Sequence, residues 1–467
     1  MIEFKTMLYP WQQAAVDKLL KLKVAALYME QGTGKTRTAL ELIAQRVNAG
    51  KVNHVIWFCP CSVKANLAED ITKHVGNIPD YITIAGIESI SESDRLYLEL
   101  SDLVNNKKVF LVVDESTLVK NHQALRTGRI INLASHVQYK MLLNGTPVTK
   151  NEADLFAQWY ILDWRILGYR SYWSFAANHL EYYRLRLPDG REFVDKSRIK
   201  RVLHVDYLTA KIDPYTYQIT KKECMKQLPA KNYCVAYCQM TEEQALEYYD
   251  TKYRYLLNID EFKSETIYKL FTALQHVAAG RRVLSEPDEK MQTEAMFDWR
   301  NSPRIERLMQ LIKVKIGNDK CIIFAKYQAE IDDIIAALNA EFGEGCCVEF
   351  TGRISQKHRQ ENRLRFKDAA QFFVANRACG AYGLNLQFCH NIIYYSNDFD
   401  WGTRAQSEDR VHRIGQNHEV NIWDIVVDGT IDERIADCLY KKENLVEKFK
   451  KELERLKCNR SELLKCL

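Results

Sequence analysis

The sequence lacks the patterns that mark membrane, secreted and fibrous proteins. No apolar run approaches the length of about 20 residues that a membrane-spanning helix needs. The N-terminus, MIEFKTMLYPWQQ, has neither the basic start nor the apolar stretch of a signal peptide. Low-complexity segments and short-period repeats are also missing. We therefore expect a soluble protein without membrane contact, in the cytoplasm of a bacterial or phage-infected cell, or in the nucleus if the source is eukaryotic.

The cysteines form no pattern that is typical of a metal or disulfide framework. There are 13 of them, an odd number, and no CxxC pair occurs. The spacing of a zinc ribbon is therefore missing. Buried thiols in a reducing compartment are the favoured interpretation.

A strong excess of one charge is also absent. The chain has 66 basic and 61 acidic residues, and its formal net charge is +5. This excess is too slight to indicate nucleic-acid binding by itself, so any such surface must be local. Hydrophobic residues make up 46% of the chain, which is typical of globular proteins. Its 467 residues exceed the roughly 250 to 300 at which one core stops growing, so we expect at least two domains.

Two stretches alternate amphipathic helical segments with short apolar strands, which is typical of parallel α/β sheets. The first runs from about residue 10 to 160, and its expected strands are residues 23–29, 54–59, 108–113 and 139–143. The second begins near Cys321, and its expected strands are residues 321–327, 347–351, 371–375, 391–395 and 421–427. Ligands of open α/β sheets gather beyond the carboxyl ends of the strands.

The region between the two stretches, residues 160–300, is rich in aromatic and charged residues with helical spacing. We interpret it as helical insertions followed by a polar connector at residues 285–302. Within it, YYRLRL, Pro188-Asp189-Gly190 and REFV predict a β-hairpin, because Asp-Gly supplies the positive φ of a tight turn.

The loop MEQGTGKT, residues 29–36, has the composition of a phosphate-binding loop. Gly32 and Gly34 let backbone N–H groups converge on phosphate, Lys35 reaches the terminal phosphates, and the Thr36 hydroxyl ligates Mg²⁺. Met29 stands where the full pattern has glycine. A chance turn is the alternative, and the position between an expected strand and an expected helix favours the phosphate loop.

Asp114 and Glu115 directly follow the apolar run KVFLVV. One carboxylate at such a strand end can join the water shell of Mg²⁺, and the other can orient an attacking water. A solvated acidic pair is the alternative, which the lysine loop disfavours.

The run QSEDRVHRIGQ, residues 406–416, places Arg410 and Arg413 three residues apart, on one side of a helical turn. Arginines supplied from across a cleft can neutralise the charge that spreads over a transferring phosphoryl group. The structural alternative is a surface arginine pair that bridges to Glu408 and Asp409.

Together these motifs resemble the Swi/Snf-type branch of helicase superfamily two, whose members are ATP-dependent translocases on double-stranded DNA. In the first half, the matching segments are LYPWQ, MEQGTGKT, FCPCSVKANLAEDI, DESTLVKN, LLNGTPVTKNEADLF and ITKKECMKQLPAK. In the second half they are IIFAKY, FTGRISQKHR, GAYGLNL and QSEDRVHRIGQ. The resemblance covers almost the whole chain.

The resemblance implies a role for each matching residue. It assigns Gln12 to adenine, Gly32, Thr33, Gly34, Lys35 and Thr36 to the phosphates, and Gly383 and Gln416 to further nucleotide contacts. It assigns Thr36 and Asp114 to Mg²⁺, Glu115 to water activation, and Arg410 and Arg413 to arginine fingers. It places DNA-backbone contacts at Ser62, Lys64, Lys326, Thr351, Gly352 and Asn385, with a plain solvated lysine as the alternative at Lys326.

The resemblance also implies the fold, which is α/β with two tandem RecA-like parallel-sheet lobes and helical insertions. The expected boundaries are residues 1–235 for lobe 1 with an insertion at about 160–215, 236–300 for a helical insertion and linker, 301–440 for lobe 2, and 441–467 for a basic C-terminal helix. ATP and Mg²⁺ are the implied cofactors and double-stranded DNA the implied partner. We expect a monomer and name no protein partner.

Two motifs depart from the family pattern. Ser116-Thr117 stands where Ala-His is usual, and residues 376, 377 and 381 differ from the usual motif V. We expect a DNA-stimulated ATPase that moves along or remodels double-stranded DNA. One alternative is a strand-separating or annealing helicase, with the Arg184, Arg186 and Arg191 hairpin as a wedge. The other, motivated by the two departures, is an ATP-gated DNA clamp.

Overall fold

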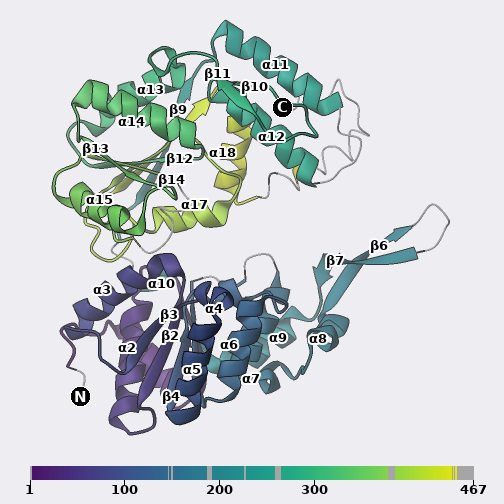
Figure 1. The fold of residues 1–467 in the computed structure, drawn as a ribbon, viewed down its shortest axis with the longest axis vertical. Coiled ribbons are helices and arrows are strands. Elements are labelled where there is room, and N and C mark those ends of the chain that lie inside the picture. The colour runs from purple at the N-terminus through teal and green to yellow at the C-terminus, as the bar shows by residue number, and fades with distance from the viewer. Residues whose placement is uncertain are drawn as a thin grey trace. The chain divides into compact units, whose positions relative to one another are not determined.

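The computed structural model consists of two units, Met1–Gln227 (unit 1) and Leu228–Leu467 (unit 2) (Figure 1). It describes residues 3–145, 147–148, 151–186, 192–225, 228–257, 264–376, 384–443, 445 and 448–449. Each unit contains its own six-stranded sheet, and all pairings within these two sheets are parallel. The expected fold class, two tandem RecA-like parallel-sheet lobes with helical insertions, is confirmed.

The sheet of unit 1 has the strand order β3-β2-β4-β5-β1-β8. Its strands are β1 (Val24–Met29), β2 (His54–Cys59), β3 (Ile82–Gly86), β4 (Val109–Val113), β5 (Tyr139–Asn144) and β8 (Thr216–Ile219). The four strands expected from the apolar runs are confirmed. The two strands that the sequence analysis did not find, β3 and β8, lie at the edges of the sheet, where a strand needs fewer apolar residues.

Helices cover both faces of this sheet. The helices among the described residues of unit 1 are α1 (Pro10–Leu19), α2 (Lys35–Asn48), α3 (Lys64–Val75), α4 (Ser89–Glu92), α5 (Asp94–Asn106), α6 (Leu125–Ser135), α7 (Leu155–Leu167), α8 (Tyr172–His179), α9 (Val205–Ile212) and α10 (Lys221–Cys224). Successive side chains of β1 enter different cores, because strand side chains alternate between faces. Ala26 and Tyr28 pack with residues of α6 and α7, whereas Leu27 and Met29 pack with residues of α1 and α2.

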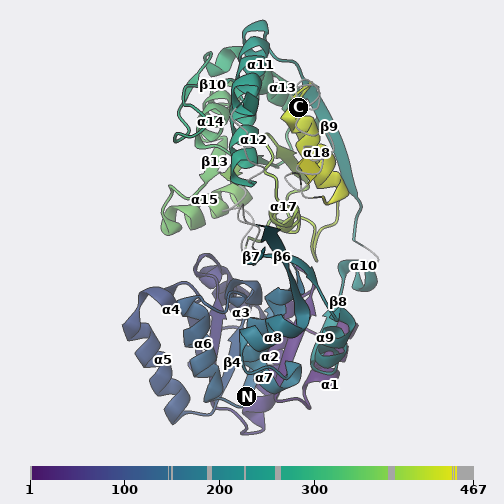
Figure 2. The same cartoon turned by 90° about the vertical axis from the view of Figure 1, so that its right-hand side faces the viewer.

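The expected hairpin is confirmed as β6 (Leu180–Arg186) and β7 (Glu192–Val202), an antiparallel pair. It projects from the rest of unit 1 beyond α8 (Figures 1 and 2). Arg191 and the expected Pro188-Asp189-Gly190 turn lie outside the described residues. Tyr183 and Phe193 on the two strands are exposed.

The sheet of unit 2 has the strand order β13-β14-β12-β15-β16-β9. Its strands are β9 (Lys231–Cys238), β12 (Cys321–Ala325), β13 (Cys347–Phe350), β14 (Phe372–Asn376), β15 (Asn391–Tyr394) and β16 (Val420–Val427). All five strands expected in the second half are present. The sixth, β9, pairs with β16 along its whole length, from Lys231 opposite Val420 to Cys238 opposite Val427.

The helices of unit 2 are α11 (Glu242–Leu257), α12 (Ser264–Ala278), α13 (Pro303–Leu311), α14 (Gln328–Phe342), α15 (Gln356–Asp368), α17 (Trp401–Glu408) and α18 (Ile431–Lys441), with one π-helical turn at Ile312–Ile316. Residues of α12 and α18 share a core. Ser302 starts α13 by accepting a hydrogen bond from the Ile305 N–H, with Pro303 at the first helical position. The expected polar connector carries β11 (Thr293–Ala295), which pairs with β10 (Arg281–Val283).

The division between the units falls after Gln227, earlier than the boundary at residue 235 expected from the sequence. The difference arises because β9 completes the second sheet. The expected basic helix at 441–467 lies almost entirely outside the described residues.

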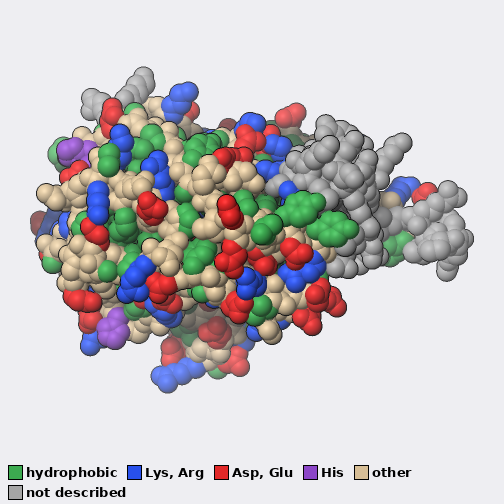
Figure 3. Space-filling view, turned by 90° about the horizontal axis from the view of Figure 1, so that it is seen from above, with side chains coloured by type: hydrophobic (Ala, Val, Ile, Leu, Met, Phe, Trp, Pro, Cys, Tyr) green, Lys and Arg blue, Asp and Glu red, His purple; other side chains and the backbone are tan. Residues whose placement is uncertain are grey.

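The surface agrees with the small net charge. The face drawn in Figure 3 carries Lys and Arg side chains interspersed with Asp and Glu side chains. Among the described residues, no helix is both long enough and apolar enough to span a membrane.

Candidate nucleotide site

The phosphate loop of unit 1 connects β1 to α2. Gly32 and Gly34 adopt φ values of 81° and 93°, a left-handed conformation that glycine tolerates best. The loop is held from within, because the Thr33 hydroxyl donates to the Glu30 carbonyl at 2.7 Å. The Lys35 ammonium donates to the Met29 carbonyl at 2.9 Å. The expected strand-to-helix loop is therefore present, with a glycine in the left-handed conformation directly before the helix.

Gln12 lies against this loop. Its side-chain N–H donates to the Gly34 carbonyl at 3.1 Å, and its side-chain oxygen accepts from the Tyr9 N–H at 2.8 Å. A Cβ added at Gly34 would lie only 2.1 Å from the Gln12 amide nitrogen. A side chain at Gly34 would therefore be strained by its φ and would displace the end of the Gln12 side chain. Contact of Gln12 with adenine stays a prediction.

Asp114 and Glu115 follow β4, whose carboxyl end lies on the same edge of the sheet as that of β1. The Asp114 N–H donates to the Phe58 carbonyl at 2.8 Å, and its carboxylate accepts from the Glu115 N–H at 2.9 Å. Glu115 has a φ of 47°, which is unusual for a residue with a side chain. Strained backbone of this kind clusters at functional sites.

The environment of Asp114 raises its pKa to about 7. Burial is the main cause, because it penalises the charged form, and the neighbouring Glu115 carboxylate adds to the increase. The Lys35 ammonium acts in the opposite direction. The fold therefore brings the lysine of the phosphate loop into electrostatic contact with the acidic pair, as the sequence predicts.

The donor set at this edge fits a hard divalent cation. Mg²⁺ prefers oxygen ligands and keeps several waters, so a hydroxyl and a carboxylate suffice on the protein side. Thr36 lies in the first turn of α2, and Asp114 supplies a carboxylate whose ionisation a cation would favour. These two residues are the ones that could hold Mg²⁺ together with a nucleotide.

Ser116, one of the two residues that depart from the family pattern, is fully buried in a polar cluster. Its hydroxyl donates to the Gln158 side-chain oxygen at 2.6 Å and accepts from the Asn144 side chain at 3.1 Å. Gln158 donates in turn to the Pro147 and Asp154 carbonyls, both at 2.8 Å. This cluster joins the acidic pair to the end of β5 and to α7. This cluster could not be predicted, because a serine after two acids gives no signal of its partners.

The two arginines predicted for the site, Arg410 and Arg413, lie in unit 2, just after a helix. The expected helical turn is α17, but it ends at Glu408, and Arg410 and Arg413 lie in the turns that follow. The Arg413 guanidinium donates to the side-chain oxygen of Asn385 and to the Leu384 carbonyl. Two predicted site residues, Arg413 and Asn385, are therefore in contact.

Gln416 is buried next to these arginines. Its side-chain N–H groups donate to the Cys389 carbonyl at 2.9 Å and to the Gln387 carbonyl at 3.1 Å. Its side-chain oxygen accepts from the His418 N–H at 3.0 Å. Both ends of the amide are engaged within the protein, so the expected contact with the nucleotide stays a prediction. Gly383, also assigned to the nucleotide, lies outside the described residues.

The residues expected to contact DNA follow the carboxyl ends of strands in both units. Ser62 and Lys64 are exposed after β2. Thr351 and Gly352 follow β13, where Gly352 is exposed and Thr351 is buried, with its hydroxyl bonded to Glu349.

Lys326 differs from the other expected DNA contacts. Its ammonium donates to the Gln275 side-chain oxygen at 2.7 Å, and it lies 3.6 Å from the Asp398 carboxylate. Only 17% of its side chain is exposed. The solvated-lysine alternative therefore does not describe Lys326 in this structure, and its contact with DNA stays a prediction.

Comparisons with known proteins agree with these motifs. Residues 80–289 match the SNF2-related domain, and residues 303–415 match the helicase conserved C-terminal domain. The phosphate loop precedes both matched regions, so its assignment depends on its own sequence and geometry.

Among curated relatives, the transcription regulatory protein SNF2 of Saccharomyces cerevisiae is 25% identical over 72% of this chain. Protein CHROMATIN REMODELING 4 of Arabidopsis thaliana is 28% identical over 73%, and the probable ATP-dependent DNA helicase CHR12 of the same plant is 24% identical over 87%. The chain spans only 20%, 15% and 38% of the length of these three relatives. Among solved structures, the Sulfolobus solfataricus SWI2/SNF2 ATPase core in complex with dsDNA is 21% identical, with coverage of 94% of this chain and 92% of that one and a TM-score of 0.40.

Proposed function

Because this chain belongs to the Swi/Snf type of helicase superfamily two, we propose that it is an ATP-driven translocase that moves along or remodels double-stranded DNA. The observation that carries the proposal is the meeting of Lys35, Asp114 and Glu115 at one edge of the unit 1 sheet. The names of the relatives, which include a DNA helicase and a chromatin-remodelling protein, support DNA as the polymer.

In the proposed reaction, unit 1 binds the nucleotide and positions the water. The backbone N–H groups of the phosphate loop and the Lys35 ammonium hold the β- and γ-phosphates. Asp114 and the Thr36 hydroxyl hold Mg²⁺, which neutralises phosphate charge when it is bound. Glu115 accepts a hydrogen bond from the attacking water and orients it toward the γ-phosphate. The strained backbone at Glu115 fixes the direction of its side chain.

Unit 2 supplies positive charge to the same nucleotide in this proposal. Arg410 and Arg413 neutralise the charge that spreads over the γ-phosphoryl oxygens in the transition state, which typically accelerates phosphoryl transfer about 10³-fold or more. Hydrolysis removes the γ-phosphate, which is the ligand that the two units share in this proposal. ATP binding would then raise the affinity of the two units for each other, and loss of ATP would lower it. DNA held by both units would be moved by this cycle.

The first prediction concerns Lys35. The substitution Lys35→Ala removes the group that neutralises the terminal phosphates, so we expect steady-state ATP hydrolysis to fall at least about 10²-fold with duplex DNA present. The matched control is Lys51→Ala, which removes an exposed lysine of the same unit. Phosphate release with and without duplex DNA measures both. Retained DNA-stimulated hydrolysis in Lys35→Ala would sink the assignment.

One alternative keeps the motor but has it separate or anneal strands. It is motivated by the projecting β6–β7 hairpin, whose Tyr183 and Phe193 are exposed. The basic residues of the hairpin are partly paired, since Arg184 lies 3.6 Å from Glu192 and Lys200 donates to Glu181 at 2.8 Å. A translocase displaces the third strand of a triplex without opening a forked duplex, whereas a helicase opens the fork.

A second alternative is an ATP-gated clamp that holds DNA without travelling. It is motivated by the departures in motifs II and V, of which residues 377–383 lie outside the described residues. A clamp would show little stimulation of ATP hydrolysis by DNA. Rates measured with single-stranded, duplex and forked DNA and with RNA separate the clamp from both motors and identify the polymer.

A further inference from the structure

The two arginines of unit 2 need support from outside their own helix. They lie beyond the end of α17, in a turn of residues 409–416. The backbone of this turn is linked to Glu408, whose carbonyl accepts hydrogen bonds from the Val411 and His412 N–H groups at 3.1 and 2.9 Å. The position of Glu408 therefore determines the position of the turn that carries both arginines.

The Glu408 carboxylate is fully buried and has partners on two sides. One oxygen accepts from the Arg404 Nε–H at 3.0 Å. The other accepts from the Lys231 ammonium at 3.0 Å and from the Tyr233 hydroxyl at 2.8 Å. A buried carboxylate is stable only when its oxygens are satisfied, so these contacts confine Glu408 to one place. Burial and the nearby Glu408 charge together raise the pKa of Tyr233, which therefore remains a hydrogen-bond donor.

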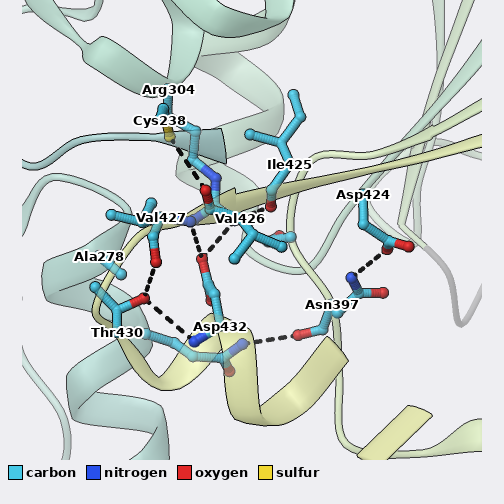
Figure 4. A network of polar contacts seen from close by, with 12 residues as sticks. Cys238, Ala278, Arg304, Asn397, Asp424, Ile425, Val426, Val427, Thr430 and Asp432 are labelled. Atoms are coloured by element: carbon cyan, nitrogen blue, oxygen red, sulfur yellow. Dashed lines mark hydrogen bonds and ion pairs between the residues drawn. The ribbon is translucent and has the colours of Figure 1, made fainter. Parts of the chain in front are cut away.

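Arg404 is itself clamped on its other side. Its guanidinium donates to the two Asp424 carboxylate oxygens at 2.6 and 2.8 Å and to the Asn397 side-chain oxygen at 3.0 Å. Figure 4 shows the Asn397 side chain, which donates to the Asp424 carboxylate at 2.7 Å. Burial alone would lower the pKa of Arg404, but the Asp424 carboxylate outweighs it and keeps the pKa above its usual value. This planar, bidentate pair is a rigid anchor for α17.

Lys231 and Tyr233 belong to β9, the first strand of unit 2 after the chain crosses from unit 1. The units are contiguous in sequence, so the chain crosses once, between β8 and β9. Lys231 is the first residue of β9, and just before it the Pro229 carbonyl lies 2.8 Å from the His412 ring Nε2. The start of unit 2 therefore makes two contacts with Glu408 and one with His412 of the arginine turn.

The other end of the crossing is fastened to the phosphate loop. The Glu30 N–H donates to the carbonyl of Ile219, the last residue of β8, at 3.0 Å. The Glu30 carboxylate accepts from the Lys221 N–H at 2.7 Å. The sequence resemblance gives this segment, residues 219–231, no task of its own. Its ends contact the loop that carries Lys35 and the turn that carries Arg410.

We propose that Lys231 and Tyr233 are positioning residues for Arg410 and Arg413, and we call the stretch that carries them, residues 228–233, the strap. The inference rests on the proposed function in one respect, the use of both arginines in ATP hydrolysis. The strap bonds one oxygen of the Glu408 carboxylate, and Arg404, which Asp424 holds, bonds the other. When Glu408 loses the hydrogen bonds from Lys231 and Tyr233, the arginines lose their position, whereas the nucleotide keeps its site on unit 1.

The test compares two tyrosines in the same network. The double variant Lys231→Met/Tyr233→Phe removes the two donors that the strap gives to Glu408. The matched control is Tyr440→Phe, because the Tyr440 hydroxyl donates to the Asp424 carboxylate at 2.9 Å and its ring contacts the Tyr233 ring edge to face. Both hydroxyls therefore bond a buried carboxylate of one network, but only Tyr233 belongs to the strap.

The readouts are kcat and the KM for ATP in the full chain, with thermal melting as a check of the fold. For the double variant we expect kcat to fall at least about tenfold, because misplaced arginines lose transition-state contacts, while the KM for ATP changes less than about threefold. For Tyr440→Phe we expect kcat within about twofold of the parent. Lys231→Arg, which keeps a charged donor at Glu408, should retain most of the parent kcat.

Either of two results overturns the proposal that the strap positions the arginines. One is an unchanged kcat in the double variant, and the other is an equal loss in Tyr440→Phe, which would make the network merely structural. All rates are measured without nucleic acid as well as with saturating duplex DNA. A parent enzyme that no nucleic acid stimulates would contradict the proposed DNA function, while the basal kcat of the variants still decides whether the strap positions the arginines.

Discussion

At the residue scale, Asp114 links the chemistry of unit 1 to its stability. Its pKa in the folded protein is about 7, well above the ordinary value of 3.8. The folded state therefore holds a proton that the unfolded state has released between about pH 4 and pH 7. The free energy of unfolding consequently decreases as the pH rises through this window. The charged form of Asp114, which would hold Mg²⁺ in the proposed function, thus weakens the nucleotide-free fold.

We predict that Asp114→Asn stabilises the nucleotide-free protein at pH 8 while abolishing turnover. The amide carries no charge to bury, so the free energy of unfolding should rise by about 1 kcal/mol or more at pH 8. The difference in the free energy of unfolding between the variant and the parent should disappear near pH 4, where the parent carboxyl is protonated. Denaturant titrations at both pH values measure it, with Asp80→Asn, an exposed aspartate of the same unit, as the control. A variant less stable than the parent at pH 8 would contradict the assigned burial cost.

The residues of the site differ in how readily their sequence reveals them. Lys35, Asp114 and Glu115 could be predicted, because a loop or an acidic pair after an apolar run specifies its own chemistry. Ser116 and Glu408 could not, because their importance comes from partners that are distant in sequence, Gln158 for the first and Lys231 for the second. A side chain that acts by holding another leaves no local pattern.

At the element scale, β9 decides where unit 2 begins. Its partner β16 is an apolar strand, and β9 covers that strand's outer edge. Without β9, the backbone groups that residues 420–427 direct away from β15 would be unpaired and available to other chains. An edge strand with tyrosines and exposed polar residues has a weak apolar pattern, which is why the sequence analysis placed the boundary at residue 235, inside this strand.

We predict that a fragment of residues 228–467 is soluble and folded, whereas a fragment of residues 239–467 aggregates. The two differ only in the edge strand and the residues just before it. Size-exclusion chromatography and circular dichroism of the purified fragments compare them at equal concentration. Equal yields of monodisperse protein from both would mean that β9 is dispensable for unit 2.

At the scale of the whole molecule, the mixed surface charge limits how DNA can be held. Basic and acidic side chains are interspersed on the face drawn in Figure 3, and the net charge is only +5. Binding would then depend on a few local phosphate contacts rather than on a broad positive field. Such contacts carry little sequence information, so we expect weak sequence preference.

We predict a strong dependence of DNA stimulation on salt. Raising the salt from 50 to 200 mM should raise the duplex concentration that gives half-maximal ATP hydrolysis at least about tenfold, because each phosphate contact releases a counterion. Basal hydrolysis in the same buffers is the control and should change much less. If the half-maximal duplex concentration is independent of salt, phosphate contacts are not the main source of the affinity for DNA.

The single crossing between the units also fixes an upper limit on their separation. Only residues 220–230 connect the last strand of one sheet to the first strand of the other. Eleven residues span at most about 36 to 40 Å even when fully extended. In the proposed function, a tether of that length keeps the arginine turn of unit 2 at an effective concentration of about millimolar for the nucleotide on unit 1, whatever the protein concentration in the cell. The encounter of the arginine turn with the nucleotide is therefore intramolecular. The proposed rate of ATP hydrolysis per molecule should not depend on the protein concentration.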